Sequence, residues 1–504
     1  MLEVKEVGKL ELKNNNANKK QFLQLFIMIV LTILTQIITI LKTSTVAGLF
    51  GATVEMDAFS FSNSIGTFIF SFIGAGITTV LIPNLVSDEK EKEVNIFISV
   101  LYTLAFFVLI SVYLFRKVIV QGLSNGSDEF VYIACNVMLI TLITQYITSF
   151  LGATNAIFQC SGKFNFPKVI NLIFTVILVL LIVFMPNLTI YKYAFYILIT
   201  SIINVVIQIW LAIHDGYRFR YSLNIKNNEF KNMFKVFLPT VLSTGLYQFS
   251  LVTDTVISSN LGEGSVSILS YSNTLMTMVN TILLTNLMTY FYPKIARSIN
   301  REDSQEKLFD LMILLNGIMC LVVVGFFVVG RDSIILLYER GKFTSTITNL
   351  VYIGTLIYML GIPINTMRDL IYRYFYAKGD TLTPFKNSVI VSIANIVISI
   401  IMARCIGIYG IILGTVITSY ISFGMILYRF NKKFGIQYSK KILVKENIKL
   451  IIDAVIVSFI VNGITNLLSN MNILVRIIIL GIISIIIYAV ILVIFKSKVL
   501  KVRL

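Results

Sequence analysis

Residues 94–115 read VNIFISVLYTLAFFVLISVYLF, a stretch without a single charged side chain. A helix of about 20 apolar residues is long enough to cross the hydrocarbon core of a bilayer. A membrane-spanning strand would need only about ten residues and would alternate apolar with polar side chains, and this stretch does neither. The stretch therefore predicts a transmembrane helix.

Comparable stretches recur along the whole chain and account for most of it. They occupy residues 22–44, 57–83, 94–115, 131–158, 168–186, 192–213, 235–258, 266–291, 307–329, 345–366, 384–404, 407–429, 446–468 and 472–495. The predicted fold class is an all-α polytopic membrane protein with about 14 transmembrane helices. The composition agrees, since 57% of the 504 residues are hydrophobic and 13% are charged, against roughly 45–50% and 25% in soluble domains. This balance excludes an ordinary soluble enzyme.

The net charge of +17, from 42 Lys and Arg against 25 Asp and Glu, has a topological explanation. The basic residues collect in the terminal segments and in alternate loops, of which the longest are His214–Lys235 and Arg429–Lys449. Because cytoplasmic loops carry an excess of Lys and Arg, both termini are predicted to be cytoplasmic. A nucleic-acid partner is not needed to explain the charge, and none is predicted.

The sequence offers little for catalysis or for a tightly bound cofactor. Its four cysteines are scattered singly over apolar stretches, which predicts neither disulfides nor a zinc site. The one histidine, His214, falls in a predicted loop, and no G-x-x-x-x-G-K-[ST] phosphate loop occurs. We therefore predict that the chain is not an enzyme, has no cofactor and no firm metal site, and couples any transport to Na+, H+ or the membrane potential.

The chain also repeats itself at an offset of 210 residues. The matching pairs are Ser60-Phe61-Ser62-Asn63 with Ser270-Tyr271-Ser272-Asn273, Thr45-Val46 with Thr255-Val256, and Pro83 with Pro293. Six predicted helices separate the copies, so the two copies have the same orientation in the membrane. Parallel lobes with a binding site between them near the bilayer midplane are an architecture of secondary transporters.

The repeat predicts two six-helix lobes and two additional C-terminal helices. The predicted parts are a cytoplasmic tail over 1–21, an N-lobe over 22–213, a basic cytoplasmic linker over 214–234, a C-lobe over 235–429, a second cytoplasmic linker over 430–445, and the last two helices with a basic tail over 446–504.

Ionisable side chains inside apolar helices are costly and usually mark a polar pathway. Lys42 is predicted to face a cavity, although a lysine near a helix end can also extend to the membrane interface. Asp254 is predicted to be its counter-charge or an ion-coupling residue, and the alternative is a structural hydrogen bond between helices. Asp57 opens the second helix, where a capping role is favoured over substrate contact.

Two amides, Asn63 and Asn273, occupy equivalent positions of the repeat. Buried asparagines commonly hold transmembrane helices together, which is the alternative to a role in lining a cavity. We include both in the predicted cavity lining.

Several motifs resemble the MurJ/MviN group of the multidrug/oligosaccharidyl-lipid/polysaccharide exporter superfamily. They are Leu49-Phe50-Gly51-Ala52 followed by Asp57-Ala58-Phe59 and Pro83, then Leu337-Tyr338-Glu339-Arg340-Gly341-Lys342-Phe343-Thr344, then Arg368-Asp369, Arg373-Tyr374-Phe375-Tyr376-Ala377 and Asp380-Thr381-Leu382-Thr383-Pro384. The resemblance covers the first twelve predicted helices, and fourteen helices is also usual in that family.

The resemblance implies a flippase in the bacterial cytoplasmic membrane. Its substrate would be a polyprenyl-diphosphate-linked saccharide, lipid II or a related cell-wall or polysaccharide precursor, moved from the inner to the outer leaflet by alternating access. Its partners would be this substrate and membrane lipids, with cell-wall synthesis proteins as further candidates. A diphosphate cannot cross about 30 Å of hydrocarbon unaided, so a hydrated cationic cavity is expected.

The chain departs from the family pattern where charge matters. The family's first-helix cavity arginines fall on Gln36 and Lys42, and its eighth-helix arginine falls at or beside Asn273. Some relatives bind sodium, and the resemblance places Asp254 and Asn395 at ligand positions but puts Ser399 where a carboxylate is expected. The implied cavity is therefore less cationic, and the implied ion site carries less negative charge.

Three alternatives stay open at this point. A cation-coupled drug or metabolite antiporter of the same superfamily would use Asp57 and Asp254 as an acidic site. A membrane scaffold for cell-wall synthases would have no cavity, and a membrane glycosyltransferase would need an acidic catalytic residue facing a sugar donor.

Overall fold

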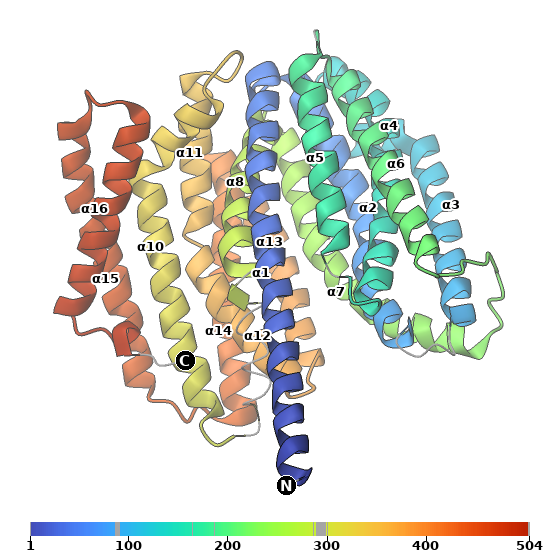
Figure 1. The fold of residues 1–504 in the computed structure, drawn as a ribbon. Coiled ribbons are helices and arrows are strands. Elements are labelled where there is room, and N and C mark those ends of the chain that lie inside the picture. The colour runs from blue at the N-terminus through green and yellow to red at the C-terminus, as the bar shows by residue number, and fades with distance from the viewer. Residues whose placement is uncertain are drawn as a thin grey trace. The chain divides into compact units, whose positions relative to one another are not determined.

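The computed structural model describes residues 2–85, 91–163, 165–185, 187–285, 287–288, 299 and 301–501. Within these residues, side chains are described except at 2–25, 75–76, 79, 239–240, 242–244, 246–247 and 285. The described chain is mostly helical, with short connecting loops, and contains no strand (Figure 1). Every backbone polar group in hydrocarbon needs a partner within the protein, and a helix supplies one inside each segment.

Each predicted apolar stretch overlaps one or two of the observed helices, several of which extend beyond it. They are α1 Leu2–Phe50, α2 Val54–Leu85, α3 Glu91–Leu123, α4 Asp128–Cys160, α5 Phe166–Phe184, α6 Ile190–His214, α7 Asn228–Ser259, α8 Ser265–Val279 with the π-helical turn η2 Asn280–Thr285, α10 Ser304–Tyr338, α11 Ser345–Met359, α12 Ile362–Ala377, α13 Leu382–Ile406, α14 Ile408–Phe434, α15 Lys440–Thr465 with η3 Asn466–Leu468, α16 Ile473–Ile494 and η4 Lys498–Lys501.

The all-α membrane fold is confirmed, since eleven described segments are long and apolar enough to cross a bilayer. The number of 14 crossings and the cytoplasmic position of both termini stay predictions. The end of the predicted helix 266–291, and Pro293 of the repeat, lie outside the described residues.

One predicted helix is interrupted within a single candidate membrane span, Ser345–Ala377. The stretch 345–366 was expected to be a single helix, but the chain breaks at Leu360–Gly361 into α11 and α12. Pro363 follows the break, and a proline lacks an amide donor and disfavours helical backbone at the residue before it. The exposed Leu360 carbonyl accepts a hydrogen bond from the Tyr420 hydroxyl on α14 at 3.2 Å.

The first helix is longer than predicted. α1 continues through the stretch 2–21, which was expected to be a tail. This stretch contains no proline, so nothing in it forces the helix to begin later.

The contacts of the chain divide it into two compact units. Unit 1 comprises Met1–Thr43, Ile69–Arg116 and Val137–Thr244, and unit 2 comprises Ser44–Phe68, Lys117–Asn136 and Gly245–Leu504. Several helices contribute one end to each unit, so these boundaries do not follow the predicted lobes, which stay a prediction.

Unit 1 is held together by amides between its helices. Asn204 on α6 donates to the Asn171 side-chain oxygen on α5 at 2.7 Å, and Gln208 donates to the Asn204 oxygen at 2.9 Å. Thr154 on α4 donates to the Gln208 oxygen at 2.9 Å. Such interhelical bonds replace the hydrophobic effect, which does not drive helix association in lipid.

In unit 2 the last two long helices pack on α10 (Figure 1). The seam joins Val324 of α10, Val457 of α15 and Leu480 of α16, all buried. At one end of the seam the Arg476 guanidinium on α16 pairs with the Asp332 carboxylate on α10, with Nε and Oδ2 2.6 Å apart. α15 and α16 are therefore an integral wall of unit 2.

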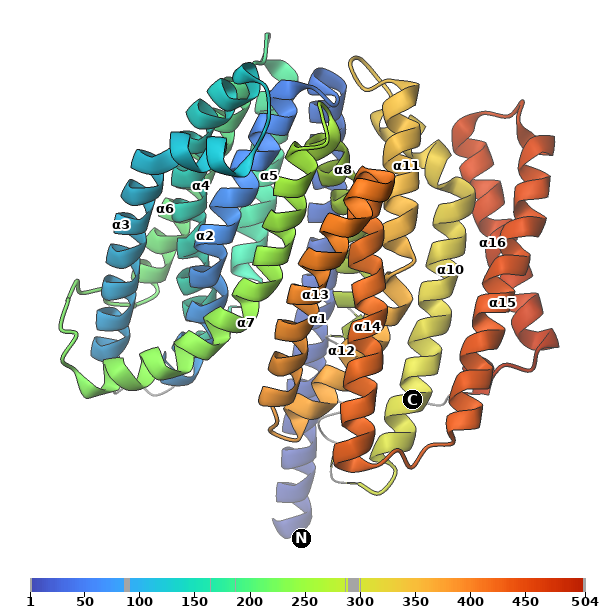
Figure 2. The same ribbon diagram turned by 180° about the vertical axis from the view of Figure 1, so that it is seen from behind.

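The start of α13 is fixed by Asp380, next to α14 (Figure 2). Its carboxylate accepts hydrogen bonds from the Thr383 amide at 2.9 Å and the Lys433 ammonium on α14 at 2.6 Å. Burial alone would raise the pKa of Asp380, but the hydrogen bonds from Lys433 and Thr383 outweigh it and lower the pKa to about 2. The Asp-Thr-x-Thr-Pro motif is thus a helix cap joined to the neighbouring helix.

Candidate functional site

A buried polar cluster joins three helices of unit 2. Asp254 lies on α7, Asn395 on α13 and Thr415 on α14, and the first two are only 3% and 4% exposed. The Thr415 hydroxyl donates to Asp254 Oδ2 at 3.0 Å. The Asn395 amide donates to the hydroxyls of Thr415 and Thr418 at 3.2 and 3.3 Å. These contacts bring side chains 161 residues apart into one site.

Three buried oxygen atoms of this cluster have no hydrogen-bond partner. They are Asp254 Oδ1, Asn395 Oδ1 and Ser399 Oγ, and the first and the last lie near enough for Ser399 to interact with the Asp254 carboxyl group, without the distance or angle of a regular hydrogen bond. Leaving buried oxygens unpaired costs free energy, which a bound cation would recover, and hard cations prefer oxygen ligands. The donor set therefore fits a small monovalent cation.

The structure brings the three predicted ion-site residues together, and it adds two that sequence reasoning missed. Thr415 and Thr418 lie one turn apart on α14, and each hydroxyl also bonds to its own helix backbone. Because Thr commonly bonds to the preceding turn of a transmembrane helix, the sequence gives no sign of a second role. No group of three His, Cys, Asp or Glu side chains suited to a metal occurs in the described part of the chain.

Asp57 is used at a different place in unit 2. Its carboxylate accepts hydrogen bonds from the Gly264 amide at 2.6 Å, the Ser267 amide at 2.7 Å and the Ser267 hydroxyl at 2.5 Å. The first amides of a helix have no partner within it, and the helix dipole favours a negative charge there. Asp57 therefore caps α8, although it lies in the first turn of α2.

A second contact fastens the end of α1 to the turn between α10 and α11. The Arg340 guanidinium and the Leu337 carbonyl both bond to the Ser44 hydroxyl, and the Lys342 amide donates to the Gly48 carbonyl at 2.8 Å. A Cβ added at Gly341 would lie 2.2 Å from the Gly48 oxygen. Glycine is required here because the two backbones touch.

The two contacts lie next to each other in unit 2. The Tyr271 hydroxyl on α8 donates to the Gly51 carbonyl at 2.8 Å, between α1 and α2. We call the Asp57, Ser44 and Gly48 contacts together the closing tie. It fastens the C-terminal end of α1 to the turn 339–344, and the first turn of α2 to the start of α8.

The predicted cationic contact lies in unit 1. Lys42 is half-buried on α1, and its ammonium makes no hydrogen bond or ion pair with any residue that the structure describes. Gln36 is half-buried one and a half turns earlier on the same helix. Sequence reasoning missed Lys168 on α5, whose ammonium donates to the Thr32 hydroxyl of α1 at 3.0 Å. A cavity role for Lys42 and Gln36 stays a prediction.

The contacts described for the other predicted site residues are with residues close to them in sequence. Asn63 and Asn273 are half-buried, and the Thr277 hydroxyl lies 3.5 Å from the Asn273 side-chain oxygen. Arg368 on α12 pairs with the adjacent Asp369, with Nη2 and Oδ1 2.9 Å apart. Arg373 is half-buried one turn further along. Their predicted roles are not tested by these contacts.

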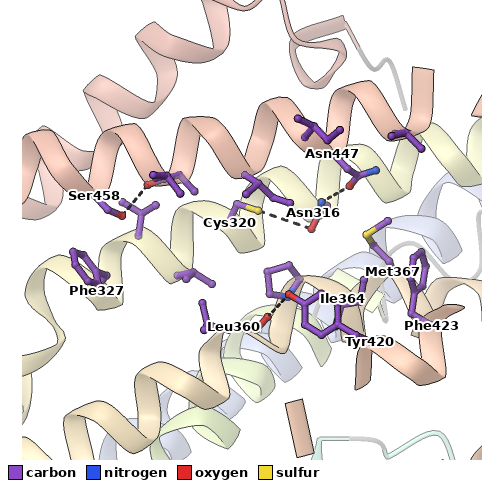
Figure 3. A pocket seen from close by; sticks show the side chains of 18 of the residues that line it. Asn316, Cys320, Phe327, Leu360, Ile364, Met367, Tyr420, Phe423, Asn447 and Ser458 are labelled. Carbon is purple, nitrogen blue, oxygen red and sulfur yellow. Dashed lines mark hydrogen bonds between the residues drawn. The ribbon is translucent and has the colours of Figure 1, made fainter. Parts of the chain in front are cut away.

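A long apolar groove of about 730 Å³ runs between α10 and α15 on one side and α11, α12 and α14 on the other (Figure 3). Phe327, Met367 and Phe423 contribute to its walls, and Asn316, Cys320 and Asn447 form a small polar patch on one side. The Asn316 amide donates to the Asn447 side-chain oxygen, so this patch is largely self-satisfied. The groove suits a long hydrocarbon chain.

Comparison with known proteins adds a family to this geometry. The family model described as lipid II flippase MurJ matches residues 46–482. A probable lipid II flippase MurJ of Rickettsia prowazekii (strain Madrid E) is 23% identical over 442 residues, covering 84% of this chain and 85% of the relative. One of Aquifex aeolicus (strain VF5) is 25% identical over 369 residues, covering 71% and 72%.

Solved structures agree on the fold. The inward closed conformation of a lipid II flippase MurJ superposes with a TM-score of 0.79 at 23% identity, covering 92% of this chain and 98% of that one. An inward-facing multidrug resistance MATE family transporter superposes with a TM-score of 0.67 at 13% identity, covering 81% and 98%.

The closing tie predicts different effects for two glycine substitutions. Gly341 and Gly379 both have a positive φ, +56° and +77°, but nothing lies within 4 Å of a Cβ added at Gly379. Gly379→Ala should cost only the backbone strain, about 1 kcal/mol. Gly341→Ala should lower the thermal unfolding midpoint further, because the chain must separate from Gly48. Equal shifts for the two variants in a thermal melt would contradict the tie.

Proposed function

Because this chain belongs to the lipid II flippase MurJ family, we propose that it moves a polyprenyl-diphosphate-linked saccharide across the bacterial cytoplasmic membrane. Lipid II is the first candidate, carried from the inner to the outer leaflet. The match of the family model over residues 46–482 is the observation that carries this proposal. The chain is a multi-pass membrane protein, and the family is one of transporters, so no catalytic step is assigned to it.

The groove supports such a cargo. A polyprenyl tail is a long flexible hydrocarbon, and a groove with almost entirely apolar walls offers it a continuous surface at membrane depth. The head group needs the opposite environment, since a diphosphate keeps its charge and requires water or cations. Substrate recognition then divides between an apolar tail site and a polar head site.

Lys42 supports the head site. A half-buried ammonium without a partner among the described residues has its charge available for a phosphate. Contacts between ammonium and phosphate are among the strong hydrogen bonds, because both partners are charged. Lys168 supplies a second cation on the neighbouring α5, partly engaged by Thr32. At Lys42, where the resemblance implies an arginine, the ammonium would hold the head group as a point charge instead of through two parallel hydrogen bonds.

Alternating access needs contacts that break and re-form, and the closing tie is suited to this. Its hydrogen bonds join segments far apart in sequence, and water can replace each of them at modest net cost. If the protein opened at the closing tie, Asp57 would separate from the start of α8, and the turn 339–344 would separate from α1. Because Asp57 satisfies the first amides of α8 only when the tie is closed, it favours one closed arrangement over others.

The cluster around Asp254 supports coupling to a monovalent cation. Asp254, Asn395 and Ser399 would supply oxygen ligands from α7 and α13, and Thr415 positions the Asp254 carboxylate. A single carboxylate favours Na+ over a divalent ion, because it balances one positive charge. An ion held there would link α7 to α13 and α14.

The antiporter alternative gains no support. The likeness to MATE transporters lies in the fold, at 13% identity. Asp57, which that alternative needs as part of an acidic site, has its carboxylate occupied by three donors at α8. Association with cell-wall synthesis proteins stays a prediction.

The head-site assignment predicts a loss of flipping in Lys42→Ala. A charge-assisted hydrogen bond contributes about 1.5–3 kcal/mol, which corresponds to roughly a 10- to 150-fold weaker hold on the diphosphate. Transfer of fluorescent lipid II across proteoliposome membranes measures the effect. Lys42→Arg should retain most activity, and Lys192→Ala, in the first turn of α6, is the matched control. Full activity of Lys42→Ala would exclude this residue as the main contact.

The tail-site assignment predicts that filling the groove blocks long-tailed substrates. Ala454→Phe adds a ring to the groove wall, whereas Ile452→Phe adds one to an exposed face of the same helix that does not line the groove. The first variant should lose transfer of lipid II with its natural tail and keep transfer of a short-tailed analogue. Equal loss with both tail lengths would contradict tail binding in this groove.

The ion-site assignment predicts stabilisation by sodium. An ion that binds only the folded protein raises its unfolding midpoint with concentration. The purified protein should melt at a higher temperature in NaCl than in choline chloride, and Asp254→Asn should remove this difference. Asp453→Asn, which changes a buried carboxyl outside the cluster, should keep it. A sodium shift that survives in Asp254→Asn would place the ion elsewhere.

A further inference from the structure

The loop between α6 and α7 contains a segment that neither the fold nor the proposed transport explains. Residues 217–226 read Tyr-Arg-Phe-Arg-Tyr-Ser-Leu-Asn-Ile-Lys. Apolar residues occupy every odd position and polar or basic residues every even one, with three cations and no acid. We call this segment the strap. All of it belongs to unit 1 and it is not helical.

The strap is pinned along one side of α3. Its partners are Glu91, Asn95, Ser99 and Thr103, which follow one another at intervals of four and therefore share one helix face. The Arg218 amide donates to the Glu91 carboxylate at 2.8 Å, and the Arg218 carbonyl accepts from the Asn95 amide at 2.8 Å.

The same stripe holds the rest of the strap. The Ser222 amide donates to the Ser99 hydroxyl at 3.1 Å, and the hydroxyls of Tyr221 and Thr103 lie 3.0 Å apart. The Tyr217 hydroxyl donates to the Asn95 side-chain oxygen at 2.7 Å. The polar stripe on this face of α3 therefore binds the strap along its length.

The spacing of these contacts shows that the strap is extended. From Arg218 to Ser222 the strap advances four residues while its partners advance eight residues on α3, from Glu91 to Ser99. Eight helical residues rise about 12 Å, so the strap rises about 3 Å per residue, as an extended chain does. In an extended chain, successive side chains point to opposite faces. The alternating sequence thus presents an apolar row and a basic row.

Both rows are open to their surroundings. Phe219, Leu223 and Ile225 of the apolar row are 46%, 47% and 58% exposed. Arg218 and Arg220 of the basic row are exposed, and neither guanidinium makes a hydrogen bond or ion pair with any described residue. Figure 2 shows this loop beside α3.

The position along α3 locates the strap at the membrane boundary. The apolar stretch of α3 begins at residue 94, between Glu91 and Asn95, the two residues that bind the Arg218 backbone. The distribution of basic loops places the start of α3 on the cytoplasmic side. This is the depth where acyl chains meet head groups on the inner leaflet.

We propose that the strap is a binding site for anionic phospholipids of the inner leaflet. The apolar row enters the boundary between head groups and acyl chains, and Arg218 and Arg220 bind the lipid phosphates. Arginine suits this role because its planar guanidinium bonds to phosphate through two donors. An acidic protein segment would satisfy the basic row but leave the apolar row exposed to water. The site would fix the linker between α6 and α7 at the membrane surface.

The experiment compares variants of the full chain in vesicles of phosphatidylcholine with and without phosphatidylglycerol. Native mass spectrometry counts the bound phosphatidylglycerol, and a thermal melt measures the stabilisation it gives. In Arg218→Gln with Arg220→Gln, the affinity for phosphatidylglycerol should fall roughly tenfold or more, because each cation near an anionic surface contributes about 1 kcal/mol. The bonds of the strap backbone to α3 remain in this variant, so it should fold.

The matched control is Lys440→Gln with Lys441→Gln, which removes the same charge from exposed positions at the start of α15. It should keep the phosphatidylglycerol effect. Phe219→Ser with Leu223→Ser should weaken binding as well, whereas soluble glycerol phosphate should not stabilise the protein. The proposal is overturned if the arginine variant binds phosphatidylglycerol as the parent does, if the control loses as much, or if soluble glycerol phosphate replaces the lipid.

Discussion

A polar group withdrawn from water costs free energy unless it finds a partner, and this cost decides how several helices of unit 2 are joined. The first amides of α8 have no partner in their own helix, and the Asp57 carboxylate supplies one. Asp332 is likewise buried and paired with Arg476 of α16, and Glu446 of α15 accepts hydrogen bonds from the Ser497 hydroxyl and the Lys498 amide. Each of these contacts fixes how two segments are positioned along each other. The few charged groups therefore make the helix packing specific, while the apolar side chains provide most of the contact area.

Much of the fold could be predicted from the sequence, because an apolar stretch of about 20 residues has one stable solution in a membrane. The bounds of α5, α6 and α16 lie within a few residues of the predicted ones. The division of 345–366 into α11 and α12 could not be predicted with the same assurance, since Pro363 is compatible with a kinked continuous helix as well as with a break. The hydropathy of the stretch 345–366 is the same for a kinked and for a broken helix, so it does not distinguish them.

The residues of the candidate site could be predicted where they belong to a sequence motif. They could not be predicted where side chains from several helices come together. The motifs around Gly51 and Gly341, far apart in sequence, prove to contact each other, which explains why both contain glycine at a crowded point. Asp254, Asn395 and Ser399 also meet as the resemblance implied. Thr415 and Thr418 were missed because a hydroxyl in a helix usually bonds to its own backbone. The groove was missed because it has no local sequence pattern: five helices each contribute one side to it.

The hydrogen bonds between Asp57 and Ser267 join positions 210 residues apart, the same interval as the internal repeat. Residues that correspond in the two copies of the sequence repeat therefore contact each other. Identical residues could not form this pair, since two aspartates would repel each other and two serines would leave the α8 amides without an anion. The two copies of the sequence repeat must therefore differ at the position where they contact each other.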